Sequence, residues 1–139
     1  MIVTLMELAR RSKESVENCP VYLASRILGK RWTLLILQTL LTPEAKKGLR
    51  YSQLQRRLNW VSPKVLTQRL RELESEGIAK RSVDASVIPP NVSYSLTKKG
   101  RDLEGIIRLI QEWGRQYGGK KVKKCLSHGF ENCHSCEQE

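Results

Sequence analysis

Apolar residues in the middle of the chain recur every three or four positions, the spacing that predicts amphipathic α-helices. The pattern covers residues 20–28, 32–41 and 62–76, a short stretch around Leu54 and Leu58, and a long stretch from Thr97 to Tyr117. The stretch at 32–41 is apolar on most sides, which indicates a helix at the centre of the core. The chain is therefore expected to be mainly helical.

A different pattern follows residue 77. Residues 78–83 and 92–96 alternate between apolar and polar positions, which predicts two short β-strands. The segment between them contains Pro89-Pro90 and cannot continue a strand ladder. These two strands are expected to form a small β-hairpin, and the polar residues 42–50 are expected to form a loop.

Two of the predicted helices are separated only by a tight turn at residues 59–61. Ser52 is expected to cap the first helix, and Ser62 followed by Pro63 to open the second. Gly77 is expected to end the second helix. This spacing is typical of a helix-turn-helix, and the hairpin that follows would be its wing. The predicted fold class is α+β, mainly α with a small β-hairpin: a winged helix-turn-helix.

The helix at 62–76 carries the most functional information. Its stripe of Leu66, Leu70 and Leu73 is expected to face the core. The side chains on the opposite face are of the types that reach base edges in the DNA major groove. They are Lys64, Thr67, Gln68 and Arg71, with Arg69 near the boundary. An ordinary solvated helix face is the alternative, but this face turns acidic only towards its end.

Further residues are expected to contact the DNA backbone. Ser and free backbone N–H groups at a helix start can bind a phosphate, and Arg and Lys on neighbouring elements can add contacts. These residues are Ser52, Gln53, Arg56, Ser62, Pro63, Lys80 and Arg81. The predicted wing loop is poor in Lys and Arg and is expected to contribute less than a basic wing.

Composition narrows the class of partner. The 139 residues include 25 Lys and Arg against 14 Asp and Glu, a formal charge of +11 that favours a polyanionic partner. RNA binding or nonspecific architectural binding is the alternative to sequence-specific binding of duplex DNA. Single-strand binders display aromatic platforms on which bases stack, whereas Trp32 and Trp113 lie on predicted apolar faces, which argues against this alternative.

No apolar run is long enough to span a membrane and no secretory signal is apparent, so a cytoplasmic location is expected.

Five motifs occur in the order found in one known family. They are CPV at residues 19–21, GKRWTLLIL at 29–37, SPKVLTQRLRELE at 62–74, PP at 89–90 and YSLT at 94–97. The chain resembles the HxlR family. The resemblance implies a homodimeric winged-helix transcription factor related to the MarR type, with residues 62–76 as the recognition helix.

The resemblance also implies a division of the chain. Residues 1–18 and 98–118 would be dimerisation helices, and 19–97 would be the DNA-binding domain. The basic tail at 119–139, rich in Cys and His, is not part of the family pattern. The long helix keeps an apolar stripe wider than a small core needs, which agrees with a two-fold dimer that reads an inverted repeat. The residues expected at the dimer interface are Leu5, Leu8, Ile106, Ile107, Ile110 and Trp113.

The cysteines suggest additional chemistry. Cys19 stands where some members of the family carry a redox-sensing cysteine, and the start of a helix favours the thiolate form of a cysteine. The alternative is that Cys19 is simply a small buried residue.

The tail contains a C-x2-H-x4-C-x2-C pattern that could hold a structural Zn²⁺, formed by Cys125, His128, Cys133 and Cys136. A disulfide and an unliganded tail are the alternatives. No cofactor is expected to be required. Only Glu131 lies inside the cluster, so no enzymatic activity is expected.

Overall fold

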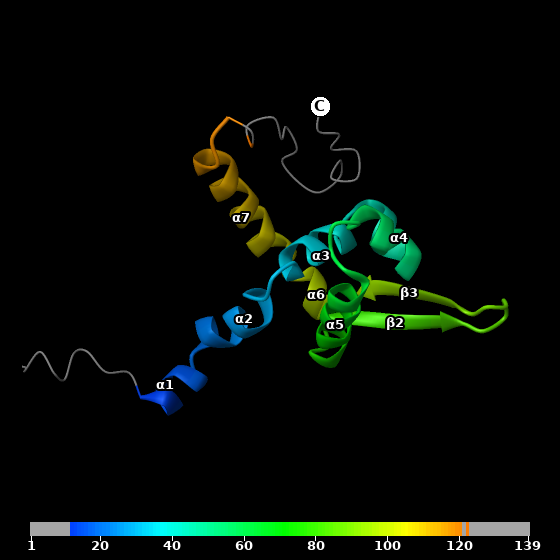
Figure 1. Ribbon diagram of the computed structural model, residues 1–139. Helices are drawn as coiled ribbons and strands as arrows, with labels where there is room; N and C mark the ends of the chain where they lie inside the picture. Colours follow the sequence, from blue (N-terminus) through cyan, green and yellow to red (C-terminus); the bar gives the residue numbers. More distant parts are fainter. Residues whose placement is uncertain (1–11, 121, 123–139) are drawn as a thin grey trace, which may run out of the picture. The chain divides into compact units, whose positions relative to one another are not determined.

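The computed structural model describes residues 12–120 and 122 (Figure 1), and the chain divides into two units with the boundary between Thr33 and Leu34. The first unit contains α1 (Lys13–Glu17) and α2 (Pro20–Leu28). Ser12 caps α1 by accepting a hydrogen bond from the backbone N–H of Ser15. Pro20 opens α2 and Gly29 follows its last residue, as the sequence predicts. Leu5 and Leu8, expected in a dimerisation helix, lie outside the described residues.

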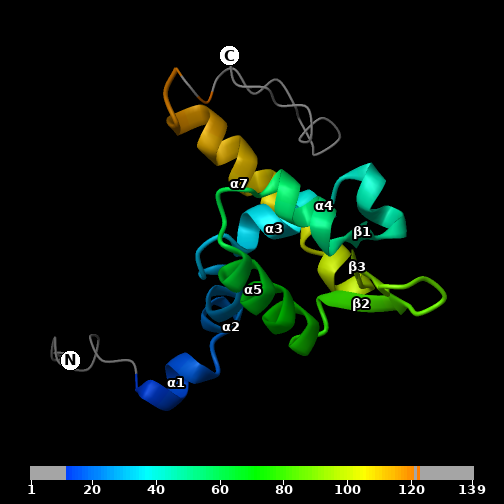
Figure 2. The same ribbon diagram turned by 45° about the vertical axis from the view of Figure 1, so that its right-hand side comes forward.

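The second unit contains the helix-turn-helix. α3 (Thr33–Leu40) begins at the boundary between the two units, and α4 (Tyr51–Arg57) and α5 (Pro63–Ser75) follow. Figure 2 shows α4 and α5 in the same body with the wing projecting from it. Most of the fully buried side chains of this unit come from these three helices, because each contributes its apolar face to one core. They include Ile36, Leu37, Leu54, Leu66 and Leu70.

The end of α5 is fixed by backbone geometry. Gly77 adopts φ +71°, a conformation that residues with a side chain rarely reach. The amide of Ile78 donates to Leu73 and that of Gly77 to Glu74, which is the hydrogen-bond pattern of a Schellman motif. The prediction that Gly77 ends this helix is confirmed, and the chain turns directly into the first strand of the wing.

The wing belongs to a three-stranded antiparallel sheet with strand order β1-β3-β2. β2 (Ala79–Asp84) and β3 (Asn91–Leu96) form the expected hairpin. β1 (Leu49–Arg50) adds a third strand, with Leu49 opposite Tyr94. The predicted hairpin is confirmed, and β1 is a third strand that the sequence analysis did not predict.

The expectation of a plain loop at residues 42–50 was wrong. This segment contains η1 (Pro43–Lys47), a 3-10 helix, as well as β1. Ala45 packs into the core, which anchors η1.

The long helix predicted after Thr97 is interrupted. Thr97 caps the short α6 (Lys98–Arg101), whose Gly100 amide donates to the Thr97 hydroxyl. After two further residues the chain continues as α7 (Glu104–Tyr117). The interruption coincides with a tight contact between the backbone of α6 and the start of β2: a side chain on Gly100 would overlap the carbonyl oxygen of Ile78. The start of α7 is thereby fixed relative to the sheet.

Candidate nucleic-acid interface

The start of α5 is built as the sequence predicts. The Ser62 hydroxyl accepts a hydrogen bond from the Val65 amide at 3.2 Å, and Pro63 occupies the first turn. This arrangement satisfies one of the amides that an α-helix leaves without an internal partner, and the others still point out of the helix. Ser62, Pro63 and Lys64 are all exposed. The N-terminus of α5 thus offers amide donors beside a lysine, a suitable environment for a phosphate.

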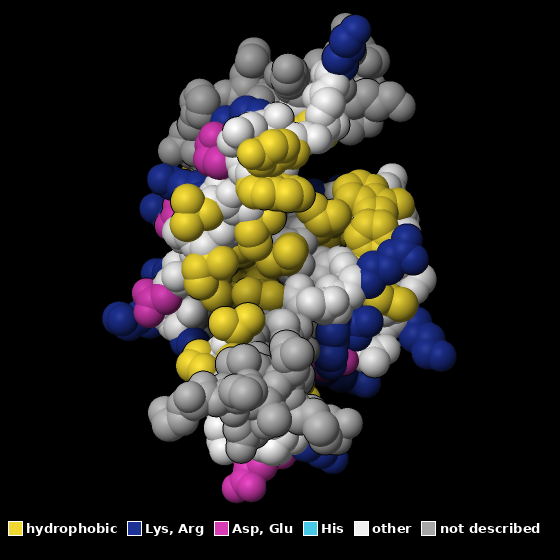
Figure 3. Space-filling model, turned by 90° about the vertical axis from the view of Figure 1, so that its left-hand side faces the viewer, with side chains coloured by type: hydrophobic (Ala, Val, Ile, Leu, Met, Phe, Trp, Pro, Cys, Tyr) yellow, Lys and Arg dark blue, Asp and Glu magenta, His cyan; other side chains and the backbone are white. Residues whose placement is uncertain are grey.

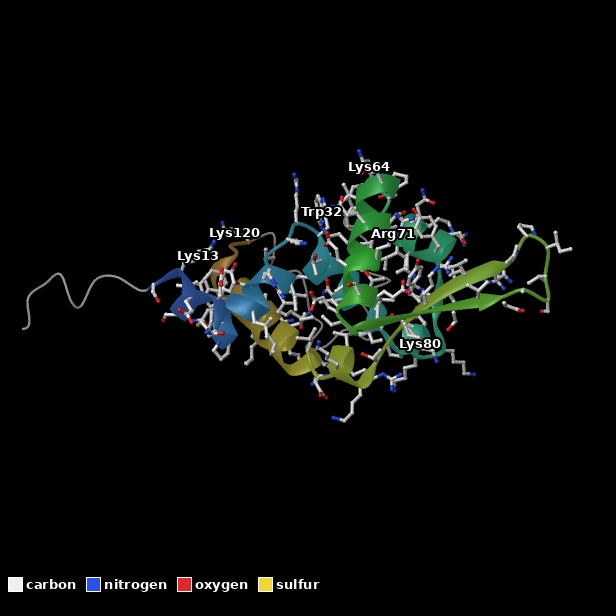
Figure 4. The ribbon with its side chains drawn as sticks, turned by 90° about the horizontal axis from the view of Figure 1, so that it is seen from below. Lys13, Trp32, Lys64, Arg71, Lys80 and Lys120 are labelled. Carbon is white, nitrogen blue, oxygen red and sulfur yellow. The ribbon has the colours of Figure 1, made fainter. Side chains whose placement is uncertain are left out.

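One face of α5 is polar and exposed along its length. Lys64, Gln68 and Arg71 are exposed, whereas the opposite stripe of leucines is buried. Their spacing of four and three residues places the three side chains on one side of the helix. Figure 4 shows Lys64 at one end of α5 and Arg71 further along it. α5 can therefore present two cations and an amide to a groove without disturbing the core.

Thr67 lies on the edge of this face and is held by a residue that the sequence did not single out. The Tyr51 hydroxyl is 3.1 Å from the Thr67 hydroxyl oxygen and donates to the Pro63 carbonyl at 3.3 Å. Tyr51 is the first residue of α4, so this contact joins the two helices of the motif at the start of α5. Nothing in local sequence periodicity signals a hydrogen bond between residues 16 positions apart.

Arg69 lies outside the exposed face. Its Nη1 is 3.1 Å and 3.2 Å from the two carboxylate oxygens of Glu72, and its side chain is 16% exposed. Glu72 also accepts from the Gln68 amide at 3.4 Å. Glu72 therefore orients two neighbouring side chains of α5, and Arg69 is less accessible than Arg71.

The helix before the turn differs from the prediction at its start. α4 begins at Tyr51 with Arg50 at the N-cap position, so the expectation that Ser52 caps it was wrong. The cap comes from Gln53, whose side-chain oxygen accepts a hydrogen bond from the Arg50 amide at 2.9 Å. Ser52 and Arg56 are exposed, and both remain able to reach a DNA backbone.

The wing exposes its cations and an apolar tip. Lys80 and Arg81 lie on β2 and are exposed, as is the rest of that strand after Ala79. At the tip, Ile88 is 97% exposed. The hydroxyl and the amide of Ser86 both donate to the carboxylate of Asp84, and these hydrogen bonds lower the pKa of Asp84.

The outer face of α7 is apolar. Leu109, Trp113 and Tyr117 are 72%, 67% and 66% exposed, and Ile106 and Ile110 are also exposed. The rings of Trp113 and Tyr117 lie 5.4 Å apart between centroids. Figure 3 shows apolar side chains gathered on the side of the molecule where α7 lies.

One residue expected in this exposed stripe lies elsewhere. Ile107 is only 4% exposed and belongs to the core, so the expectation that it lies at the dimer interface was wrong. Consecutive residues on an α-helix are separated by about 100°, and this rotation turns Ile107 away from Ile106 towards the core. Leu109 and Tyr117, which were not among the residues expected at the dimer interface, complete the exposed stripe.

Comparison with known proteins assigns the family. The family model described as "HxlR-like helix-turn-helix" matches residues 27–122. This chain belongs to the HxlR-like helix-turn-helix family. It is 42% identical over 101 residues to an HTH-type transcriptional regulator of Methanothermobacter thermautotrophicus, with 72% of each protein covered.

Solved structures agree with this assignment. A crystal structure described as a MarR-family transcriptional regulator of Porphyromonas gingivalis matches with a TM-score of 0.67 and 31% identity, covering 78% of this chain and 98% of that one. The reduced form of the redox regulator HypR matches with a TM-score of 0.66 and 32% identity, covering 73% and 95%. The fold is a winged helix-turn-helix, and this HxlR-like protein is a DNA-binding transcriptional regulator of the helix-turn-helix type.

The remaining predicted sites of this HxlR-like regulator are only partly described. Cys19 is half-buried at the N-cap position of α2 and is not part of a disulfide. The proposed zinc ligands Cys125, His128, Cys133 and Cys136 lie outside the described residues. No helix within residues 12–120 has the length and apolar character needed to cross a bilayer.

Proposed function

We propose that two copies of this regulator bind duplex DNA together, with α5 of each copy in the major groove of one half of an inverted repeat. The observation that carries the proposal is the exposed face of Lys64, Gln68 and Arg71 on a helix whose opposite face is fully buried. Arg and Lys pair with guanine and Gln with adenine in the major groove. Lys64 lies in the first turn of α5, the part that enters the groove in helix-turn-helix proteins, and Arg71 lies about two turns further along.

Other exposed residues would hold the protein on the DNA backbone. Ser62 and the amides at the start of α5 suit one phosphate, and Ser52 and Arg56 of α4 suit the neighbouring backbone. Lys80 and Arg81 on the wing can add contacts that depend on charge alone. These contacts would contribute affinity and salt dependence, whereas the face of α5 would contribute sequence preference.

Base reading is tested by removing single side chains from α5. Gln68→Ala and Arg71→Ala are each expected to weaken binding to the selected operator by about 1–3 kcal/mol, with a much smaller loss on random duplex. Lys98→Ala on α6 is the control for Arg71→Ala, because it also removes one exposed cation but lies outside the helix-turn-helix. Fluorescence anisotropy at one fixed salt concentration measures both affinities. Equal losses on operator and random duplex would indicate nonspecific binding of nucleic acid.

Dimerisation would use the exposed face of α7. A face with Leu109, Trp113 and Tyr117 about two-thirds exposed is unusual for a monomer, and aromatic residues are enriched at interfaces. Trp113→Glu is expected to convert the dimer to a monomer in sedimentation at micromolar concentration and to weaken operator binding. Gln116→Glu, which introduces the same charge at another exposed position of α7, is the control. A wild-type protein that is monomeric and still binds the operator tightly would contradict the proposal.

Cys19 is the proposed position for a response to oxidants. It lies at a helix N-terminus, an environment that favours thiolate, and one structural neighbour is a redox regulator. Cys19→Ser keeps a good N-cap residue and so is expected to preserve α2. Peroxide is expected to change operator affinity of the wild type but not of Cys19→Ser. An identical response from both proteins would exclude Cys19 as the sensor.

A further inference from the structure

A pocket of about 200 Å³ lies in the second unit, apart from the helix-turn-helix. Its walls come from the end of α3, from η1, from the last residue of β3, and from α6 and α7. None of its lining residues belongs to α4 or α5. Figure 4 shows the Lys64 end of α5 pointing away from α6. The pocket is therefore separate from the proposed DNA-reading face.

The inner wall of this pocket is apolar. Leu40, Ala45 and Leu96 line it, and all three are buried core residues. An apolar wall of this kind favours the hydrophobic part of a ligand, since most small-molecule sites combine such a wall with a few polar groups. Its volume is below that of drug-sized sites, which begin at about 300 Å³. Apolar cavities of about 150 Å³ can hold a benzene molecule, so one ring is a reasonable upper size for the ligand.

The charged residues around the pocket are mostly positive. Lys46, Arg101 and Arg108 contribute three cations, against the single carboxylate of Glu104. Glu104 accepts from Arg108 Nη2 at 2.8 Å, so these two charges largely offset each other. Within residues 12–120, neither Lys46 nor Arg101 has an ion-pair partner. The pocket thus combines an apolar wall with two cations available to an anion.

We propose that this pocket binds a small organic carboxylate with an apolar body of about one ring. The apolar body would contact Leu40, Ala45 and Leu96, and the carboxylate would lie between Lys46 and Arg101. Arginine suits this role because its planar guanidinium can donate two parallel hydrogen bonds to one carboxylate. The apolar wall distinguishes this ligand from an inorganic anion, which would gain nothing from contact with leucine.

A ligand here would touch two parts of the unit that matter for regulation. η1 leads directly into β1, which pairs with β3 of the wing, while Arg101 and Arg108 lie on α6 and α7. By thermodynamic linkage, any factor by which the ligand changes operator affinity equals the factor by which the operator changes ligand affinity. This coupling rests on the proposed function, but binding of the ligand does not, because it is measured without DNA.

The test is a titration of the full-length, DNA-free protein with benzoate at constant ionic strength. We expect saturable shifts of the backbone resonances of Lys46, Leu96 and Arg101, with a dissociation constant of about 1 mM or lower. Benzyl alcohol, which lacks the charge, and inorganic phosphate, which lacks the ring, are expected to bind at least about tenfold more weakly. Equal binding of either probe, or benzoate shifts that do not saturate, would overturn the proposal.

Two variants locate the site. Arg101→Gln keeps a polar side chain at an exposed position and is expected to weaken benzoate binding about tenfold, whereas Arg71→Gln on α5 should leave it unchanged. Ala45→Met is expected to fill the apolar wall and abolish binding, with folding checked by circular dichroism. Because Ala45 is buried, the Arg101 variant decides the outcome if the Ala45 variant does not fold. Unchanged affinity in a folded Arg101→Gln protein would refute the assignment.

Discussion

Gly100 of α6 packs tightly against Ile78, which lies in the segment between α5 and the wing. A Cβ atom on this residue would overlap the carbonyl oxygen of Ile78 and lie 3.1 Å from Cδ2 of Leu96. The Ile78 oxygen also accepts a hydrogen bond from the Thr97 amide at 3.0 Å, and the Thr97 hydroxyl lies 2.6 Å from the Gly77 carbonyl oxygen and 3.1 Å from that of Ile78. Gly100→Ala must therefore move backbone against backbone and disturb these hydrogen bonds. We predict that this substitution destabilises the fold.

The size of the effect follows from three contributions. Forcing a methyl group into a packed site costs about 1–3 kcal/mol, and a weakened hydrogen bond from Thr97 adds about 1 kcal/mol. The lower chain entropy of alanine in the unfolded state offsets about 0.4–1 kcal/mol. The free energy of unfolding of Gly100→Ala is therefore expected to fall by about 2 kcal/mol.

The matched control is the same substitution at Gly105 on α7. Apart from its chain neighbours and the backbone of its own helix, no heavy atom lies within 4 Å of the position that a Cβ would occupy there, and Gly105 is exposed. Gly105→Ala is expected to raise the free energy of unfolding by about 0.5–1 kcal/mol, because alanine favours the helix. Urea unfolding followed by circular dichroism, at one protein concentration, measures both variants. A Gly100→Ala protein within about 0.5 kcal/mol of the wild type would refute the close packing described for α6.

Three further predictions concern the cap of α5, the wing tip and the tail. Ser62→Ala removes the hydrogen bond to the Val65 amide and is expected to lower the free energy of unfolding by about 1 kcal/mol in urea; no change would contradict the capping role. Because Ser86 lowers the pKa of Asp84, the wing-tip contact is present at neutral pH and is lost as pH falls through that lowered pKa. Ser86→Ala is expected to shift the NMR titration midpoint of Asp84 upward, and an unchanged midpoint would exclude the contact. Protein purified under reducing conditions is expected to carry one zinc per chain by elemental analysis and to lose it in Cys133→Ser; metal-free wild type with alkylated tail cysteines would end that hypothesis.

The recognition helix was predictable because its signals are local. Ser62 and Pro63 mark its start, Gly77 marks its end, and the leucine stripe fixes which side faces inward. Each signal acts within a few residues, so one sequence suffices to read it. The exposed face that carries Lys64 and Arg71 follows directly from the position of that stripe.

The features that the sequence analysis missed depend on contacts between distant residues. β1 has only two residues, too few to show an alternating pattern, and its partner Tyr94 lies 45 positions away from Leu49. The break between α6 and α7 lies next to the close approach of Gly100 and Ile78, which only the folded chain reveals. Tyr51 entered the candidate interface through its contact with Thr67 for the same reason.

The arrangement of α7 links the two halves of the proposed function. Ile107 is buried in the same unit that carries α5, while the neighbouring stripe with Trp113 remains exposed. Because the core is close-packed, the exposed face of α7 and the reading face of α5 belong to one body that deforms little. A dimer formed through α7 would then hold two copies of α5 at a fixed separation. The spacing between the halves of the operator would accordingly be set by the packing around Ile107, independently of the bases that α5 reads.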